Sequence, residues 1–187
     1  MSMRTGAGLL PEAYFRAGPW TEAEYFDLPE DNLRVELLDG ALLVNPPPTA
    51  GHQHLTLRLA MALAAVCPQG LDVMVGVGVR LITGRIFIPD IAVVVSPFDL
   101  EAKVFEARAV RLALEIVSTG SVALDRAVKP RLYGESGIPT YVRIEKSGPT
   151  AHVLGLREGT YEAESEGTTL RLVEPFPAVV DLPGLLG

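Results

Sequence analysis

A glutamate in the middle of an apolar stretch restricts what this chain can fold into. Residues 112–117 read Leu-Ala-Leu-Glu-Ile-Val, a run with the length and composition of a buried β-strand, and Glu115 lies inside it. A buried carboxylate costs free energy unless a hydrogen-bonding partner or a cation compensates its charge. The fold must therefore bring a compensating group to Glu115, which is either an arginine such as Arg80 or Arg111 or a bound divalent cation.

Asp90 is a second acidic residue within an apolar, strand-like segment. It follows Pro89 in residues 85–95, where proline predicts a sheet edge, a bulge or a break in the strand. Mg²⁺ binds one or two carboxylates together with waters and substrate phosphates. If the two strands are neighbours, Asp90 and Glu115 meet at one point and form such a site. The alternative is that Pro89-Asp90 is only a turn.

Glu36 repeats the pattern in an earlier run, between Val35 and Leu37. One metal could compensate both Glu36 and Glu115. The alternative is that Glu36 faces water, since side chains alternate between the two faces of a strand.

A lysine is spaced to join these acids. Asp125, Lys129 and Tyr133 lie four residues apart and share one face of a predicted helix. A lysine beside a metal-bound phosphate can orient the attacking water or stabilise developing charge. The alternative is a surface ion pair between Asp125 and Lys129. Because Pro130 fits only the first turn of a helix, the helix either begins near Lys129 or is kinked there.

Two histidines flank Gln53 at the start of the next predicted helix. Residues two apart do not share a helix face, so at most one of His52 and His54 faces a common site. We favour His54 as the histidine that binds phosphate or transfers a proton, and we expect His52 to cap the helix.

The order of the predicted elements favours an α+β fold with a mixed central sheet and helices packed against it. Thr21 and Glu24 have capping-box spacing for a short helix that ends near Leu28, and Asp39-Gly40 predicts a hairpin. The other predicted elements are a helix over residues 54–66, strands over 71–82, 85–95, 110–117 and 141–144, a helix from the polar turn 118–121 to Gly137, and an antiparallel meander over 151–182.

Length and composition predict one domain. The 187 residues divide into an N-terminal arm, 1–18, and a domain, 19–187, with its core in 33–146 and a C-terminal β extension in 149–182. Cys67 lies in an apolar stretch, which predicts a small core residue. We see no transmembrane helix and no secretory signal, and we expect a cytoplasmic protein without membrane contact. The net charge of −7 argues against a nonspecific nucleic-acid binder but is compatible with a metal-dependent nuclease.

Several of these segments together resemble the Uma2 (DUF820) family, over roughly residues 21–145. The segments that carry the resemblance are Val35-Glu-Leu-Leu-Asp-Gly40, Pro47-Pro48 with His54, Pro89-Asp90, Glu115-Ile-Val-Ser118, and Asp125…Lys129…Tyr133…Gly137-Ile-Pro…Tyr141. Each segment is generic, but their common order is specific. That family is placed among the PD-(D/E)XK restriction-endonuclease-like folds.

The resemblance implies a site. It implies that Asp90 and Glu115 are metal ligands, that the backbone carbonyl of Ile116 is a third ligand, and that Glu36 is an additional acid. A conventional motif would place a lysine at Val117, so Lys129 of the following helix would supply it. Ser118 matches a small polar position with a structural role, and Val142 stands where many relatives carry tryptophan.

The function implied is a Mg²⁺- or Mn²⁺-dependent endonuclease that hydrolyses DNA and works as a homodimer or higher homo-oligomer. One alternative is a noncatalytic binding or assembly module that retains the fold. Another is hydrolysis of RNA or of a small nucleotide.

Overall fold

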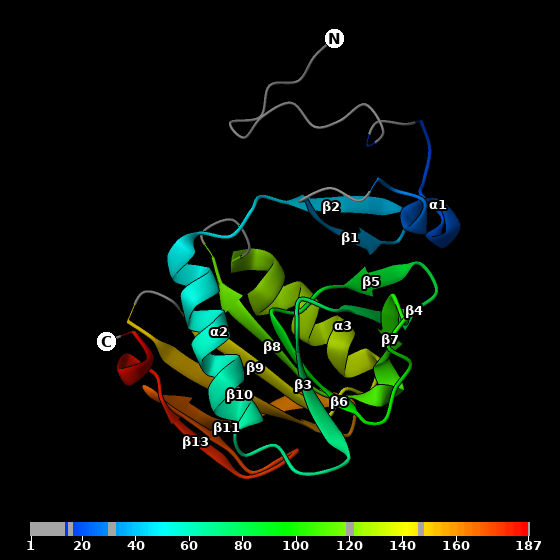
Figure 1. Ribbon diagram of the computed structural model, residues 1–187. Helices are drawn as coiled ribbons and strands as arrows, with labels where there is room; N and C mark the ends of the chain where they lie inside the picture. Colours follow the sequence, from blue (N-terminus) through cyan, green and yellow to red (C-terminus); the bar gives the residue numbers. More distant parts are fainter. Residues whose placement is uncertain (1–13, 15–16, 30–32, 119–121, 146–147, 187) are drawn as a thin grey trace.

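A computed structural model describes residues 14, 17–29, 33–118, 122–145 and 148–186. Two sheets and a separate strand pair form the fold (Figure 1). The larger sheet has the order β11-β10-β9-β8-β6-β3, and the smaller sheet has the order β2-β1-β5-β4-β7. The predicted α+β architecture with a mixed sheet is confirmed.

The larger sheet is the framework of the molecule. Its strands are β3 (Leu71–Val75), β6 (Ile91–Val95), β8 (Val110–Val117), β9 (Thr140–Glu145), β10 (Thr150–Arg157) and β11 (Thr160–Gly167). β8 and β9 are parallel, whereas the remaining neighbours are antiparallel. Strand β8 is central and apolar, as the run around Glu115 predicts.

The two faces of the larger sheet are covered by different elements, and each face has its own core. Helix α2 (Ala50–Ala64) packs one apolar face, together with the strand pair β12 (Thr169–Leu172) and β13 (Ala178–Asp181). Helix α3 (Lys129–Glu135) and the smaller sheet pack the other face. Strand alternation divides β8 between them, so that Leu112 and Leu114 face α2 and Ala113 faces α3.

The smaller sheet contains the predicted hairpin. Its strands are β1 (Arg34–Leu38), β2 (Ala41–Asn45), β4 (Gly78–Ile82), β5 (Arg85–Phe87) and β7 (Val104–Glu106). Asp39 and Gly40 have φ of 50° and 84°, the left-handed pair that a two-residue type I′ turn requires. The short helix α1 (Glu22–Phe26) has the predicted capping box between Thr21 and Glu24.

Two of the passages of the chain between the sheets divide a segment that the sequence presents as one strand. The predicted strand 71–82 is wrong, because Gly76 turns the chain at φ 64° and separates β3 from β4. In residues 85–95, the predicted break falls at Ile88-Pro89-Asp90, between β5 and β6. Asp90 therefore lies where the two sheets meet.

Short turns complete the described structure. Leu124–Val128 form a π-helical turn directly before α3, and Ala107–Ala109 and Pro183–Leu185 form 3₁₀ turns. The helix predicted from 118–121 to Gly137 is thus a π-helical turn followed by α3, and residues 119–121 lie outside the described part of the chain. No described helix has the length and apolar character needed to cross a membrane.

Candidate active site

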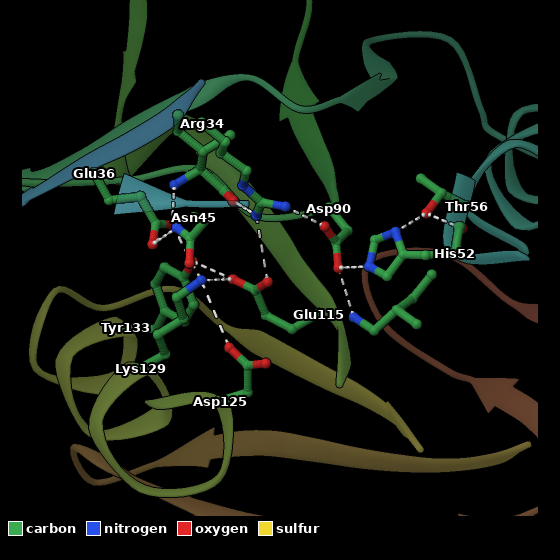
Figure 2. Close-up of polar contacts among 12 residues, drawn as sticks. Arg34, Glu36, Asn45, His52, Thr56, Asp90, Glu115, Asp125, Lys129 and Tyr133 are labelled. Atoms are coloured by element: carbon green, nitrogen blue, oxygen red, sulfur yellow. Dashed lines mark hydrogen bonds and ion pairs between the residues drawn. The ribbon is translucent and has the colours of Figure 1, made fainter. Parts of the chain in front are cut away.

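A pocket of about 940 Å³ opens where the two sheets meet, close to the start of α2 and the end of β8. The apolar lining of the pocket includes Val44, Pro46, Pro47, Pro48, Val122 and Leu124. The polar lining includes Arg34, His52, Asp90, Glu115, Asp125 and Lys129. Figure 2 shows these polar side chains converging from β1, α2, the link between β5 and β6, β8, the turn before α3 and the first residue of α3.

The register of β6 and β8 brings the two predicted ligands together. Ile91 pairs with Leu114 in this antiparallel ladder, so Asp90 lies opposite Glu115 at the next position. Side chains opposite each other on one face of a sheet have Cβ atoms within contact distance. Both carboxylates are buried, with 4% and 2% of their residue surface exposed.

Asp90 is anchored through one oxygen and contacts a cation through the other. Its Oδ2 accepts a hydrogen bond from the Ile116 N–H at 2.7 Å and lies 3.2 Å from Nε2 of His52. Its Oδ1 lies 2.5 Å from the Nη1 atom of Arg34. Burial raises the pKa of Asp90, but the His52 hydrogen bond and the Arg34 charge outweigh it and lower the pKa to about 2. Asp90 is therefore ionised at neutral pH.

The two carboxylate oxygens of Glu115 also have different partners. Its Oε1 accepts hydrogen bonds from Lys129 Nζ at 2.7 Å and from the Tyr133 hydroxyl at 3.0 Å, whereas Oε2 lies 3.7 Å from Nη2 of Arg34. Burial raises the pKa of Glu115 to about 8. The charge of Lys129 lowers this pKa, and the nearby charge of Asp90 raises it. The protein alone therefore compensates the negative charge of Glu115 less well than that of Asp90.

Lys129 lies at the first position of α3, where Pro130 fits the first helical turn. Its side chain is only 3% exposed, and Nζ lies 3.1 Å from Glu36 Oε1 and 3.6 Å from Asp125 Oδ1. The alternative of a surface ion pair with Asp125 is therefore wrong. Burial lowers the pKa of Lys129, but the charges of Glu115, Glu36 and Asp125 outweigh it and raise this pKa above its ordinary value.

Glu36 faces the site and not water. It is fully buried on β1, where Oε1 accepts a hydrogen bond from the Ile88 N–H at 2.8 Å and Oε2 accepts one from Asn45 Nδ2 at 3.2 Å. The structure thus brings together Glu36, Asp90, Glu115, Asp125, Lys129 and Tyr133, all of which the sequence singles out.

The roles predicted for His52 and His54 are wrong, because the two side chains point in other directions than expected. Thr49 caps α2 by accepting a hydrogen bond from the His52 N–H, so the His52 side chain is not the cap. His52 instead turns toward Asp90, with Nδ1 lying 3.4 Å from the Thr56 hydroxyl. His54 is on another side of the helix, where Nε2 lies 3.2 Å from the Leu185 carbonyl oxygen, and the structure does not bring it to the acids.

Arg34 and Asn45 are site residues that the sequence reasoning missed. Arg34 is two residues before Glu36, so both side chains lie on the same face of β1. This spacing is a usable signal, because a buried acid on a strand makes its same-face neighbours candidate partners.

The donor chemistry of the cluster fits a hard divalent cation. Four carboxyl groups, those of Glu36, Asp90, Glu115 and Asp125, surround two cations, Arg34 and Lys129, so acids outnumber cations in the cluster by two. Carboxylate and carbonyl oxygens are the ligands that Mg²⁺ and Mn²⁺ prefer. Among the residues that the structure describes, no three His, Cys, Asp or Glu side chains are arranged so that they could hold one metal ion.

The predicted backbone ligand has a suitable direction. The N–H of Ile116 points at Asp90, and the N–H and C=O of one strand residue point toward the same neighbouring strand. The Ile116 carbonyl therefore lies on the edge of β8 that faces Asp90.

Comparisons with known proteins identify the family of the chain. The profile of the Uma2 family, described as "Putative restriction endonuclease", matches residues 22–183. A crystal structure from Anabaena variabilis ATCC 29413, described as "a putative nuclease belonging to DUF820", is similar with a TM-score of 0.73 and 20% sequence identity, and the match covers 90% of this chain and 98% of that chain. No curated protein matches significantly. At this identity the structural likeness establishes the fold, and because the family profile spans most of the sequence, the chain belongs to the Uma2 family.

Proposed function

We propose that the protein is a Mg²⁺- or Mn²⁺-dependent endonuclease that hydrolyses phosphodiester bonds in DNA. The observation that carries the proposal is the opposed, buried pair of Asp90 and Glu115, with Lys129 Nζ 2.7 Å from Glu115. The family's description and the nuclease-like fold support the same reaction class.

Asp90, Glu115 and the Ile116 carbonyl would bind the metal. When bound, the cation would lower the pKa of a coordinated water and neutralise the charge that develops on the phosphodiester. Two cluster residues position these ligands, because the His52 ring contacts Asp90 and the Tyr133 hydroxyl donates to Glu115.

Lys129 would act on the reacting groups. Its ammonium lies within the pocket lining and has three hydrogens, so it can donate to a phosphate oxygen or orient the attacking water. Glu36 and Asp125 keep this ammonium charged and fix its position. Either carboxylate is therefore a positioning residue for Lys129.

The charge of the cluster makes the proposed reaction strictly metal-dependent. A pocket in which acids outnumber cations disfavours a phosphodiester, and a divalent cation offsets that excess of acidic groups. We therefore expect neither DNA binding in the pocket nor cleavage in a chelator.

Plasmid nicking tests the proposal. Wild type should nick supercoiled DNA with Mg²⁺ or Mn²⁺ and not with EDTA, and Asp90→Asn, Glu115→Gln and Lys129→Met should lose about 10²-fold or more in rate. Arg157→Gln is the matched control, because it breaks an exposed ion pair with Glu164 away from the pocket. Equal cutting by wild type and the three site variants would mean that the activity comes from elsewhere.

A noncatalytic module is the second candidate function. The observation that favours it is that Arg34 and Lys129 already contact all the acids that would bind a metal or a nucleophile. Calorimetry with Mn²⁺ distinguishes the two functions, because a folded wild type that binds no Mn²⁺ at millimolar concentration would support the noncatalytic module. Single-stranded RNA and small phosphodiesters in the same nicking buffer test the remaining substrate classes.

We also propose that the chain works as a homodimer or higher homo-oligomer, because two active sites can cut the two strands of a duplex together. Sedimentation of the Mn²⁺-loaded protein tests this, with a monomer at working concentration as the contrary result.

A further inference from the structure

Arg34 occupies a particular position between the two proposed metal ligands. One oxygen of each carboxylate is fixed by other groups: Asp90 Oδ2 by Ile116 and His52, and Glu115 Oε1 by Lys129 and Tyr133. The other oxygen of each, Oδ1 of Asp90 and Oε2 of Glu115, faces the Arg34 guanidinium at 2.5 Å and 3.7 Å (Figure 2).

The guanidinium is anchored but remains accessible. Its Nη2 also donates a hydrogen bond to the Ile88 carbonyl, and the side chain is 25% exposed and lines the pocket. Arg34 belongs to β1 of the smaller sheet, whereas Glu115 belongs to the larger sheet. Its contacts therefore join the two sheets across the candidate metal site.

A metal ion held by both Asp90 and Glu115 would compete with Arg34 for the carboxylate oxygens that the guanidinium contacts. The other two oxygens already accept hydrogen bonds, so they are poor substitutes. A guanidinium and a divalent cation at one point repel each other, and the metal has the higher charge. Metal binding and the present position of Arg34 are therefore mutually exclusive.

We propose that Arg34 is the resident counter-ion of the metal ligands, that the metal displaces it, and that the released guanidinium then binds the scissile phosphate. This inference rests on the proposed nuclease function. A guanidinium binds phosphate oxygens bidentately, and a released Arg34 would remain at the wall of the pocket that receives the substrate. Arg34 is thus a competitor of the metal in the free protein and a catalytic residue in the loaded enzyme.

The two roles predict opposite effects of removing Arg34: Mn²⁺ affinity should rise and the nicking rate should fall. Calorimetry and nicking on the same variant test both effects. Arg34→Met removes the competitor, so its affinity for Mn²⁺ should rise about tenfold, the equivalent of one charge-assisted hydrogen bond. Its nicking rate at saturating Mn²⁺ should fall about 10²-fold, because the phosphate loses a charged donor. A residue with a purely structural role would lower both quantities together.

Arg80→Met is the matched control. Arg80 is also on the smaller sheet, has two carboxylate partners, Glu22 and Glu106, and has a side chain that is 27% exposed. We expect it to change neither Mn²⁺ affinity nor nicking. Arg34→Lys is the second variant in case Arg34→Met does not fold. One ammonium cannot contact both carboxylates and the Ile88 carbonyl as the guanidinium does, so Mn²⁺ affinity should still rise, by about threefold.

The failure of this inference is distinguishable from that of the proposed function. If wild type binds and uses Mn²⁺ but folded Arg34→Met or Arg34→Lys binds Mn²⁺ equally or more weakly, Arg34 does not compete with the metal and the inference alone is overturned. If tighter binding comes with an unchanged nicking rate, the phosphate contact is overturned. If wild type binds no Mn²⁺, both proposals fail.

Discussion

Glu115→Gln should stabilise the metal-free protein while it removes the metal site. Glutamine keeps an oxygen that can accept the hydrogen bonds of Lys129 and Tyr133, which both donate to Oε1 of Glu115. It removes an ionisable carboxyl group from a buried cluster in which four acids surround two cations. Most substitutions of buried residues destabilise a protein, so a gain in stability here is a distinctive result.

The magnitude follows from the pKa of Glu115, which is about 8 in the folded protein and 4.5 for the ordinary group. An acid with a raised pKa binds its proton more tightly in the folded state, so its contribution to stability is complete below pH 4.5 and is lost as the pH rises to 8. Integration of this linkage gives a cost of about 4 kcal/mol at pH 8 and about 2 kcal/mol at pH 6. Since glutamine does not ionise, Glu115→Gln avoids this cost.

Urea unfolding in EDTA, followed by circular dichroism at pH 6 and pH 8, measures the effect. The free energy of unfolding of Glu115→Gln should exceed that of wild type by about 2 kcal/mol at pH 6 and by about 4 kcal/mol at pH 8. Glu166→Gln is the control, since Glu166 is 70% exposed and its substitution should leave stability unchanged at both pH values. A loss of stability at pH 8, or a gain that does not vary with pH, would refute the reasoning.

Three further predictions concern the neighbours of Glu115. Lys129→Met should lower the free energy of unfolding by about 3–5 kcal/mol in EDTA at pH 8, because it leaves buried carboxylates without their shared cation; a smaller loss than for Arg157→Gln in the same urea titration would contradict this. His52→Leu should weaken Mn²⁺ binding about 10- to 100-fold in calorimetry, whereas His52→Gln, which can still donate to Asp90, should retain most of it; equal loss in both variants would exclude the positioning role. The pKa of Asp90 falls from 3.8 to about 2 on folding, so its stabilising contribution is present above pH 3.8 and is lost between pH 4 and 2. Wild type should lose about 2 kcal/mol more over this interval than Asp90→Asn in acid titrations, and parallel curves would count against it.

The predictable part of the site came from the cost of burying charge. Glu115 lies in a run that can only be a buried strand, so its partners had to be nearby, and the structure supplies Lys129 and Tyr133. Asp39-Gly40 was equally informative, because few turns accept two consecutive residues with positive φ.

The part of the site that the sequence does not predict depends on which strands belong to which sheet. Residues 71–82 have the composition of one long strand, and nothing local reveals that Gly76 turns the chain from the larger sheet into the smaller one. That division decides which residues line the pocket. Without it, Arg34 could not be placed between Asp90 and Glu115, although its alternation with Glu36 was visible.

The orientation of the histidines was predictable but was misjudged. The buried stripe of α2 consists of His52, Leu55, Thr56, Leu59, Ala60 and Leu63. His52 has helical spacing to Leu55, Thr56 and Leu59, whereas His54 does not share that stripe. The helix predicted over residues 54–66 begins four residues after the observed start of α2 at Ala50, so His52 lies outside the predicted periodic pattern.

A crystal structure of the wild-type protein grown with Mn²⁺ would test the proposed metal site most directly. Anomalous scattering from manganese would locate the ion without assumptions about its ligands. We predict a peak between Asp90 Oδ1 and Glu115 Oε2, within coordination distance of the Ile116 carbonyl, and an Arg34 side chain that has left both carboxylates. A manganese-soaked crystal in which Arg34 still contacts Asp90 and Glu115, with no anomalous peak beside them, would contradict it.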